Sequence, residues 1–236
     1  MLRFSGRKFE HFSDYGSAAV FRDIEFRNCY FQGSSLSITL DPAVRSTVRN
    51  VQLIACSQRG CSLGCAVVED VVIDGFVTNG QLFQSWGAVF GRVVLQGKLD
   101  RLMISNEILG TTLGNEEQRQ REIAPMRIAN AEYYRHVEWA LDISRGEFKE
   151  LDIRGVPADL IRRDPDTQVV VSRAVAEKGE WRSLEFQEGL FPLSIEHSLQ
   201  HGESAVVLLA PKRHRKFRRY LEDIKLLRKA GIAQPD

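Results

Sequence analysis

The sequence predicts an all-β fold, a parallel β-helix in which short strands stack in successive coils. One phrase recurs: an apolar residue, two polar residues, an apolar residue, any residue and a third apolar residue. Each copy continues with a glycine and then a further apolar residue in common register. The three copies are Phe21–Phe26, Val48–Leu53 and Val68–Ile73. The alternation is typical of strands and the glycine of a turn, and a unit of about 20 residues must stack on its copies to bury its apolar face.

Stacking should place equivalent residues of successive coils in interior ladders. The expected ladders are Ile24–Val51–Val71, Phe26–Leu53–Ile73 and Cys29–Cys56–Phe76. The first interval between copies is longer than the second, and the extra residues fit a loop at 41–47 that contains Pro42. Such insertions lie on one face of a solenoid and often carry its function.

Two other repeat folds fit the pattern less well. Leucine-rich repeats need leucines and an asparagine at fixed spacings, and these are absent. A parallel α/β fold needs a helix of about ten residues between strands, and the glycine- and cysteine-rich interval from Cys56 to Val68 is too short for one.

The pattern changes after the third copy. Residues 1–20 alternate aromatic and polar side chains and predict either a first strand or a cap over the open end of the coil. Residues 84–95 predict more strand, and Leu99–Ile104 repeats the phrase as a fourth coil, with Gly110 one residue out of register. An insertion near 110–140 then follows.

Within this insertion, Asn115 is a good N-cap for a polar helix with acids in its first turn, and Pro125 is expected to close that helix. The segment from Met126 to Trp139 fits either a helix or a strand.

The phrase returns at Phe148–Ile153 and at Trp181–Phe186, with a strand at 167–172 between them. Leu193–Ile195 resembles the earlier strand at Leu36–Ile38, and Ala205–Ala210 predicts a last buried strand. From Pro211 onward, helical spacing of apolar residues predicts an amphipathic helix. We therefore divide the chain into an N-terminal cap at 1–20, a parallel β-helix at 21–210 and a basic C-terminal helix at 211–236.

Composition narrows the setting but not the function. The chain has 236 residues and a net charge of +1, which favours no particular partner. Basic residues are concentrated after Pro211, so the rest of the chain is mildly acidic. No apolar run is long enough for a signal-peptide core or a membrane span. Two of the four cysteines fall on interior positions, so we expect free thiols and a cytoplasmic protein, and the excess of arginine over lysine suggests a bacterial genome.

The run Lys212–Tyr220 is the main binding candidate, because clustered arginines with interleaved aromatics can contact phosphates. Its candidate residues are Arg213, Arg215, Arg218 and Arg219, and Trp86 is added as an aromatic platform. The alternative, a helix that docks its apolar stripe and leaves its charges in solvent, is favoured. Nucleic acid is therefore disfavoured as a partner, and a homo-oligomer formed through this helix is a further option.

Neither the cysteines nor the histidines match a metal motif. Cys56, Cys61 and Cys65 lack the paired close spacing of structural zinc sites. His197 and His201 are four residues apart, but Glu196 lies outside the pair rather than inside it as in H-E-x-x-H. The preceding residues read as strand, so both are expected to be surface or turn histidines. We predict no catalytic residue, no metal and no cofactor.

A second hypothesis is a carbohydrate-active enzyme. Paired carboxylates on one face of a coil can cleave glycosidic bonds, and Trp86, Trp139 or Trp181 could stack on sugars, although core packing is the favoured role for these tryptophans. The repeat also predicts a polar ladder on the outer side of a turn. Its members are Asp23, Asn50, Asp70, Arg92 and Arg101.

From Val48–Leu53 through Leu63 and its counterparts, the sequence resembles right-handed parallel β-helix proteins, and this resemblance of fold covers most of the chain. It implies a single-stranded right-handed parallel β-helix solenoid with a helical insertion and a C-terminal capping α-helix. The calcium-binding acids and catalytic arginine of the polysaccharide lyases in this class have no counterpart here.

We therefore expect a non-enzymatic cytoplasmic β-helix that binds another macromolecule, above all a protein, with an immunity or antitoxin role as one form of this function. The expected contact surface is an exposed sheet face together with the excursions at 41–47 and 110–140. End-to-end self-assembly is a third option, which well-capped ends would exclude.

Overall fold

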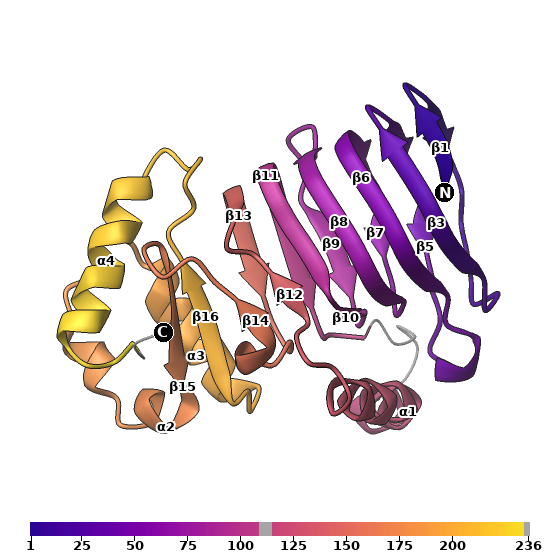
Figure 1. Ribbon diagram of the computed structural model, residues 1–236. Helices are drawn as coiled ribbons and strands as arrows, with labels where there is room; N and C mark the ends of the chain where they lie inside the picture. Colours follow the sequence, from indigo (N-terminus) through magenta and orange to yellow (C-terminus); the bar gives the residue numbers. More distant parts are fainter. Residues whose placement is uncertain (109–114, 234–236) are drawn as a thin grey trace.

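The computed structural model describes residues 1–108 and 115–233. Within them, fourteen strands form one sheet in which every strand pairing is parallel. This sheet curls, and its successive coils lie side by side across the molecule, so the large part of the fold is solenoid-like (Figure 1). A smaller unit of two strands and three helices lies at the other end of the chain (Figure 1).

The longest ladder of the sheet runs through six strands in chain order. They are β1 (Leu2–Ser5), β3 (Val20–Arg27), β6 (Thr47–Arg59), β8 (Val67–Val77), β11 (Val93–Ser105) and β13 (Gly146–Ile153). Shorter strands complete the coils. They are β2 (Lys8–Glu10), β4 (Tyr30–Gln32), β5 (Ser35–Leu36), β7 (Ser62–Leu63), β9 (Phe83–Trp86), β10 (Val89–Gly91), β12 (Leu141–Asp142) and β14 (Ile161–Arg162).

The coils bend where the third residue of the repeated phrase adopts a left-handed backbone. The φ angle is 60° at Asp23, 53° at Asn50, 54° at Asp70 and 55° at Arg92. Asp and Asn tolerate this conformation better than most residues, which explains why they occupy the position. The side chains at these corners pair between coils, since the Asn50 amide donates to Asp23 at 2.6 Å and the Arg92 guanidinium donates to Asp70 at 2.6 Å.

The expected polar ladder is therefore present at these four residues. Arg101, its fifth predicted member, lies elsewhere in the coil and donates to Glu150 of β13 at 2.6 Å.

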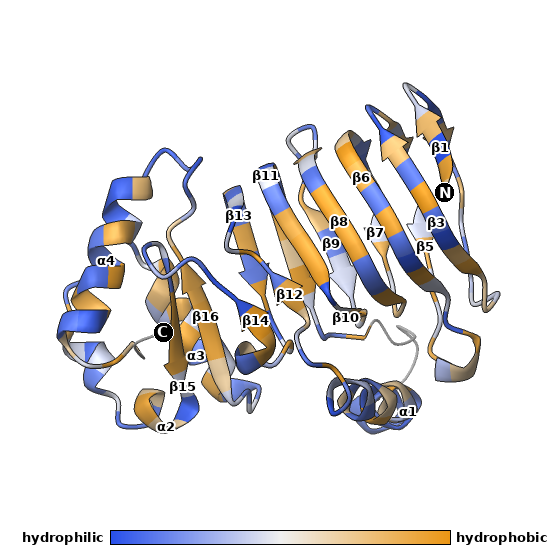
Figure 2. Cartoon of the chain, viewed as in Figure 1, coloured by the Kyte–Doolittle hydropathy of each residue, from blue (hydrophilic) through white to orange (hydrophobic). Residues whose placement is uncertain are grey.

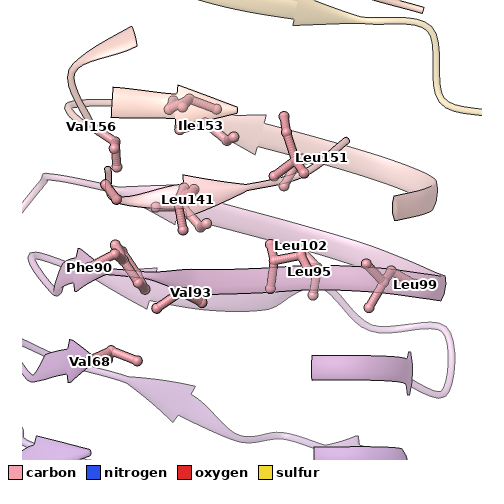
Figure 3. Close-up of a cluster of buried hydrophobic side chains, with 14 of the residues drawn as sticks. Val68, Phe90, Val93, Leu95, Leu99, Leu102, Leu141, Leu151, Ile153 and Val156 are labelled. Atoms are coloured by element: carbon pink, nitrogen blue, oxygen red, sulfur yellow. The ribbon is translucent and has the colours of Figure 1, made fainter. Parts of the chain in front are cut away.

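The interior ladders are confirmed by the strand register. Ile24 pairs with Val51 and Val51 with Val71, while Phe26 pairs with Leu53 and Leu53 with Ile73. Cys56 pairs with Phe76, and both belong to one buried cluster that also holds Cys29. The cluster continues through β11, β12 and β13, whose leucine, isoleucine and valine side chains fill the interior (Figure 3).

The register of the fourth coil differs from the expectation. Phe90 pairs with Val68 and Leu95 with Ile73, so the fourth copy of the phrase begins at Phe90. Leu99, which was expected to begin it, instead pairs with Phe76 of the third ladder. Phe90–Leu95 and Leu99–Ile104 have the same apolar spacing. The left-handed residue Arg92 lies in the first segment and has no counterpart in the second.

The insertion contains helix α1 (Glu116–Tyr134), and the predicted N-cap is confirmed because the Asn115 side chain accepts a hydrogen bond from the Gln118 N–H at 2.9 Å. Pro125 does not close this helix. Ile123 and Met126, on either side of the proline, are fully buried, and this packing offsets the cost of an interior proline. Residues 110–114 of the predicted insertion, including Gly110, lie outside the described residues.

The C-terminal unit pairs β15 (Gln168–Ser172) with β16 (Ala205–Leu209) in antiparallel fashion, so these strands form a separate sheet. Its helices are α2 (Arg173–Ala176), α3 (Leu190–Gln200) and α4 (Phe217–Lys229). Three short 3-10 helices complete the described elements, at Pro42–Val44 (η1), Ala158–Leu160 (η2) and Glu180–Ser183 (η3).

Two predicted strands in this unit are wrong. Trp181–Phe186 begins as the 3-10 helix η3, and Leu193–Ile195 lies inside α3. Pro192 is compatible with α3 because it falls in the first turn, where its missing N–H has no intrahelical partner to lose. Trp181 and Ile195 are buried in a second core with Ile224, so their apolar character serves helix packing.

The amphipathic helix expected after Pro211 is present as α4, which buries Tyr220, Ile224 and Leu227. The boundaries proposed between domains stay a prediction. None of the described helices has the length and apolar character needed to cross a membrane.

Replacing Leu99 by alanine tests the interior packing. Leu99 has no exposed surface, so Leu99→Ala should lower the free energy of unfolding by about 3 kcal/mol through lost burial and a residual cavity. Ile128 on α1 is 70% exposed, and Ile128→Ala should change it by less than about 0.5 kcal/mol. Urea unfolding followed by circular dichroism measures both, and equal effects would contradict the described core.

Candidate functional site

The N-terminal end of the large sheet is open. β1 pairs only with β3, and β2 pairs only with β4, so no strand among the described residues covers their outer edges. Of the two alternatives for residues 1–20, the chain has strands that form a first coil. An open edge presents unpaired peptide groups and can bind a further strand.

The direction of these peptide groups follows from one hydrogen bond. The Gly6 N–H donates to the Arg27 carbonyl at 2.9 Å, so the peptide groups of Gly6, and of alternate residues before it, face β3. The N–H and C=O groups of Arg3 and Ser5 therefore face the open side. A strand added there would find donors and acceptors at both residues.

Apolar side chains surround this edge. Leu2 is 59% exposed, Phe12 is 50% exposed and Tyr15 is 75% exposed. Phe4 stacks on Phe26 with ring centres 5.4 Å apart, so the aromatic part of the core continues to the last strand. Apolar and polar residues alternate along β1 and β3 at this end (Figure 2).

The edge is also basic. β1, β2 and the turn between them contain three exposed basic residues, Arg3, Arg7 and Lys8, and one acidic residue, Glu10. Lys8 and Glu10 form an ion pair at 2.8 Å, and Arg3 forms a longer one with Glu25 of β3 at 4.0 Å. The exposed edge therefore has a net positive charge.

Asp14 fixes the segment that follows the edge. Its buried carboxylate accepts hydrogen bonds from the N–H groups of Ser17 and Ser37, each at 3.1 Å, and from the Ser46 hydroxyl at 2.5 Å. Burial opposes ionisation, but these hydrogen bonds, led by that of Ser46, hold the pKa of Asp14 below its ordinary value. The charged carboxylate therefore stabilises this end of the fold.

The two expected excursions lie against each other. The Arg45 guanidinium donates to Asn130 of α1 at 3.0 Å, and the Asn130 amide donates to the Gly87 carbonyl at 2.9 Å. Tyr133 of α1 donates to Glu69 at 3.1 Å, and burial raises the pKa of Tyr133. These polar groups are already hydrogen-bonded to other residues of the chain, so the excursions have fewer groups available to a partner than the open edge has.

The predicted basic run forms the turn before α4 and the first turn of that helix. Arg213 pairs with Asp100 at 3.2 Å, and Arg219 pairs with Glu188 at 3.3 Å. Arg215 and Arg218 are exposed, and no ion pair is found for either within the described residues. With Lys216, Phe217 and Arg219, they line a surface hollow of about 480 Å³.

Part of this basic charge is neutralised locally. Lys216 donates to the Glu188 carboxylate at 2.6 Å, and this hydrogen bond, with that from Arg219, holds the pKa of Glu188 below its ordinary value. Asp223 of α4 in turn accepts from the N–H groups of Gln187 and Glu188 at 2.8 and 3.0 Å, and burial raises the pKa of Asp223. The basic turn is thus held to the protein by its own ion pairs.

Trp86 does not lie with the basic turn. It belongs to β9 in the large sheet, whereas α4 is on the far side of the β15–β16 sheet (Figure 1). Arg162 stacks over the Trp139 ring at 4.1 Å, and buried Trp181 donates to the Ala176 carbonyl at 2.9 Å. A second hollow, of about 420 Å³, is lined by Tyr30, Ser57, Arg59, Asn79 and Gln81. Neither hollow is lined by a carboxylate or a tryptophan.

The sequence interpretation missed one cluster. Because α3 is a helix, His197 and His201 lie one turn apart, with ring centres 3.9 Å from each other. Glu107, which follows β11, reaches the same place, and one ligand atom from each of the three residues lies within 4.8 Å of the others. The spacing of four residues is the available signal in the sequence, but Glu196 lies outside the pair and the preceding residues predict a strand, so the sequence favours surface or turn histidines.

Comparisons with known proteins identify no relative. No protein-family model, no curated protein and no solved structure matches the chain. Function is therefore inferred from its own residues.

The Asp14 carboxylate predicts a pH dependence of stability. Asp14→Asn keeps the shape of the side chain but leaves one acceptor oxygen, so at neutral pH the free energy of unfolding should fall by about 2 kcal/mol. Because the pKa is lowered in the folded state, this stabilisation is fully present above the ordinary pKa of 3.8 and is lost as the pH falls through the folded value. The difference from wild type should therefore shrink as the pH falls below 3.8.

Urea unfolding over this pH range measures the effect. Asp166, an exposed aspartate, is the matched control, and Asp166→Asn should change stability by less than about 0.5 kcal/mol. A difference for Asp14→Asn that stays constant down to about pH 2 would contradict the role of the charge.

Proposed function

We propose that this chain is a right-handed parallel β-helix that binds another protein without catalysing a reaction, and that its open N-terminal edge is the binding surface. The occupant is an extended segment of the partner that adds as a strand beside β1. The observation that carries this proposal is the unpaired outer edge of β1, with the peptide groups of Arg3 and Ser5 facing outward. Right-handed crossovers between parallel strands, which strongly prevail in proteins, support the hand of the coil.

Strand addition supplies both affinity and selectivity. Main-chain hydrogen bonds to the edge give affinity, and alternate side chains of the added strand select the partner. The added apolar side chains would extend the aromatic stack that ends at Phe4 and Phe9. Acidic side chains would complement Arg3, Arg7 and Lys8. The partner segment should therefore alternate apolar and acidic residues.

A second copy of this chain fits the edge less well. Head-to-tail assembly needs an open edge at the other end of the coil, but the Phe148 carbonyl of β13 accepts the Arg213 N–H at 2.9 Å, and the C-terminal unit packs against β13. Joining two N-terminal edges would bring like charges together, because Arg3, Arg7 and Lys8 would face their own copies. Both arguments favour a different protein.

A reducing, cytoplasmic setting is supported by the cysteines. All four are free thiols, and Cys29, Cys56 and Cys65 are buried. Burial raises the pKa of the Cys65 thiol to about 11, so this group is protonated and unreactive at neutral pH. The carbohydrate-enzyme hypothesis gains no support from the two hollows, since neither has the paired acids it requires.

Proline substitution at the edge tests the proposal. In Arg3→Pro the outward N–H is lost and the added ring obstructs an incoming strand, while the hydrogen bonds of β1 to β3 are kept. The full chain with a C-terminal tag is used for affinity capture from an extract of its native cells. The amount of the captured protein should fall at least about tenfold with Arg3→Pro, whereas Arg3→Ala, which keeps the N–H, should retain most of it.

Direct contact is checked by photo-crosslinking. A benzophenone side chain at Ser5 should crosslink to the captured protein, and the same group at Ile128 on α1, which is 70% exposed, should not. Equal capture by wild type and Arg3→Pro would exclude the edge as the surface. Sedimentation that shows a wild-type dimer and an Arg3→Pro monomer would instead make the occupant a second copy.

A further inference from the structure

Two histidines and a glutamate meet where the C-terminal unit contacts the large sheet. His197 and His201 come from one face of α3, and Glu107 comes from the residues that follow β11. Their potential ligand atoms lie within 4.8 Å of one another. Glu107 and His197 are half-buried and His201 is exposed, so the cluster can be reached from solvent.

The hydrogen bonding of His201 prepares it as a ligand. Its Nδ1 atom lies 2.8 Å from the His197 carbonyl oxygen, which can only accept, so Nδ1 carries the proton and donates. The lone pair of the ring is therefore on Nε2. A ring that donates one N–H to a backbone carbonyl and offers its other nitrogen is the usual arrangement of a metal-binding histidine.

The ring of His197 is oriented by a hydrogen bond from a neighbouring side chain. Its Nε2 atom accepts a hydrogen bond from the Arg154 guanidinium at 3.0 Å, which again leaves the proton on Nδ1. Arg154 also pairs with Asp152 at 2.6 Å, so it keeps a partner when a cation takes the His197 lone pair.

The surrounding charges favour a cation. Glu107 and Asp152 face His197, and Glu203 faces His201, while Arg154 supplies the opposing positive charge. One oxygen of Glu203 is buried and has no hydrogen-bond partner among the described residues. The site therefore combines two imidazoles with more carboxyl groups than guanidinium groups.

We propose that Glu107, His197 and His201 bind a divalent first-row transition-metal ion, of which Zn²⁺ is the best match, with a fourth position left for water. Two imidazoles and one carboxylate form a known ligand set for Zn²⁺. Ligand atoms around a tetrahedral Zn²⁺ lie about 3.3 Å apart. Binding therefore requires the two imidazole rings, which stack at an interplanar angle of 15°, to rotate until both lone pairs meet at the ion. The ion would link α3 to the end of β11 and so join the two cores.

Titration of the metal-stripped full chain with ZnCl₂ in a calorimeter tests the proposal. Wild type should bind one Zn²⁺ at this site, and the thermal unfolding midpoint should rise with Zn²⁺ concentration. Loss of an outer contact to a metal ligand weakens binding about 10- to 100-fold, so His201→Ala and Glu107→Gln, which remove a ligand, should each weaken it at least about 100-fold. Both positions tolerate substitution, because His201 is exposed and Glu107→Gln preserves shape.

His136 provides the matched control. It follows α1, and its ring is 3.0 Å from Glu132, four residues earlier, but among the described residues it belongs to no group of three potential metal ligands. His136→Ala should bind Zn²⁺ as wild type does. Titration with CoCl₂ separates a cysteine site from this one, since thiolate ligands add a charge-transfer band in the near ultraviolet that the proposed site lacks.

Three results would overturn the proposal. They are the absence of stoichiometric Zn²⁺ binding by wild type, unchanged binding by His201→Ala and Glu107→Gln, and a thiolate band with Co²⁺. None of these readouts involves the N-terminal edge, so the metal site and the proposed function stand or fall separately.

Discussion

Parallel pairing in register is the constraint on which the large sheet depends. β3, β6 and β8 lie residue for residue on one another, so a bend at one position must recur at the same position in the neighbouring strand. The left-handed residues Asp23, Asn50, Asp70 and Arg92 meet this requirement. Because the bends are fixed, the apolar residues between them must fall on common ladders, and extra residues can only leave the coil between strands, as those around η1 do.

The two ends of the coil are treated differently. At the C-terminal end, the β15–β16 sheet and its helices form a second core that packs against β13. A basic residue of the last segment takes part in this closure, since Arg213 forms an ion pair with Asp100 of β11. At the N-terminal end, exposed peptide groups, aromatic rings and positive charge remain together. This asymmetry directs the search for a partner to residues 1–15.

The repeating part of the fold could be predicted from the sequence, because the same types of residue recur at each corner and at each ladder position. The ladders from Ile24 to Ile73 are an example. The register of Leu99 could not be predicted, since the segment that begins at Phe90 and the segment that begins at Leu99 have the same apolar spacing. They differ in the left-handed φ angle of Arg92, which the sequence does not show.

The C-terminal unit has no sequence repeat, so no equivalent positions support the assignment of its strands and helices. A short apolar alternation such as Trp181–Phe186 fits a strand and a 3-10 helix equally well, and tertiary packing decides between them. The histidine cluster was missed for a related reason. His197 and His201 share a face only if the segment is helical, and Glu107 reaches them through packing that connects residues far apart in the chain.

The closure at Arg213 has a consequence for biosynthesis. The coils leave the ribosome first, in order, and each can pair with the previous one as soon as it emerges. The edge of β13, however, receives its hydrogen bond from Arg213 only when much of the last third of the chain has been made. At translation rates of about 5–20 residues per second, both the β1 edge and the β13 edge of the nascent coil stay unpaired for several seconds. Truncated products that end before β16 would keep that second edge and should be the species most exposed to aggregation or to capture by chaperones.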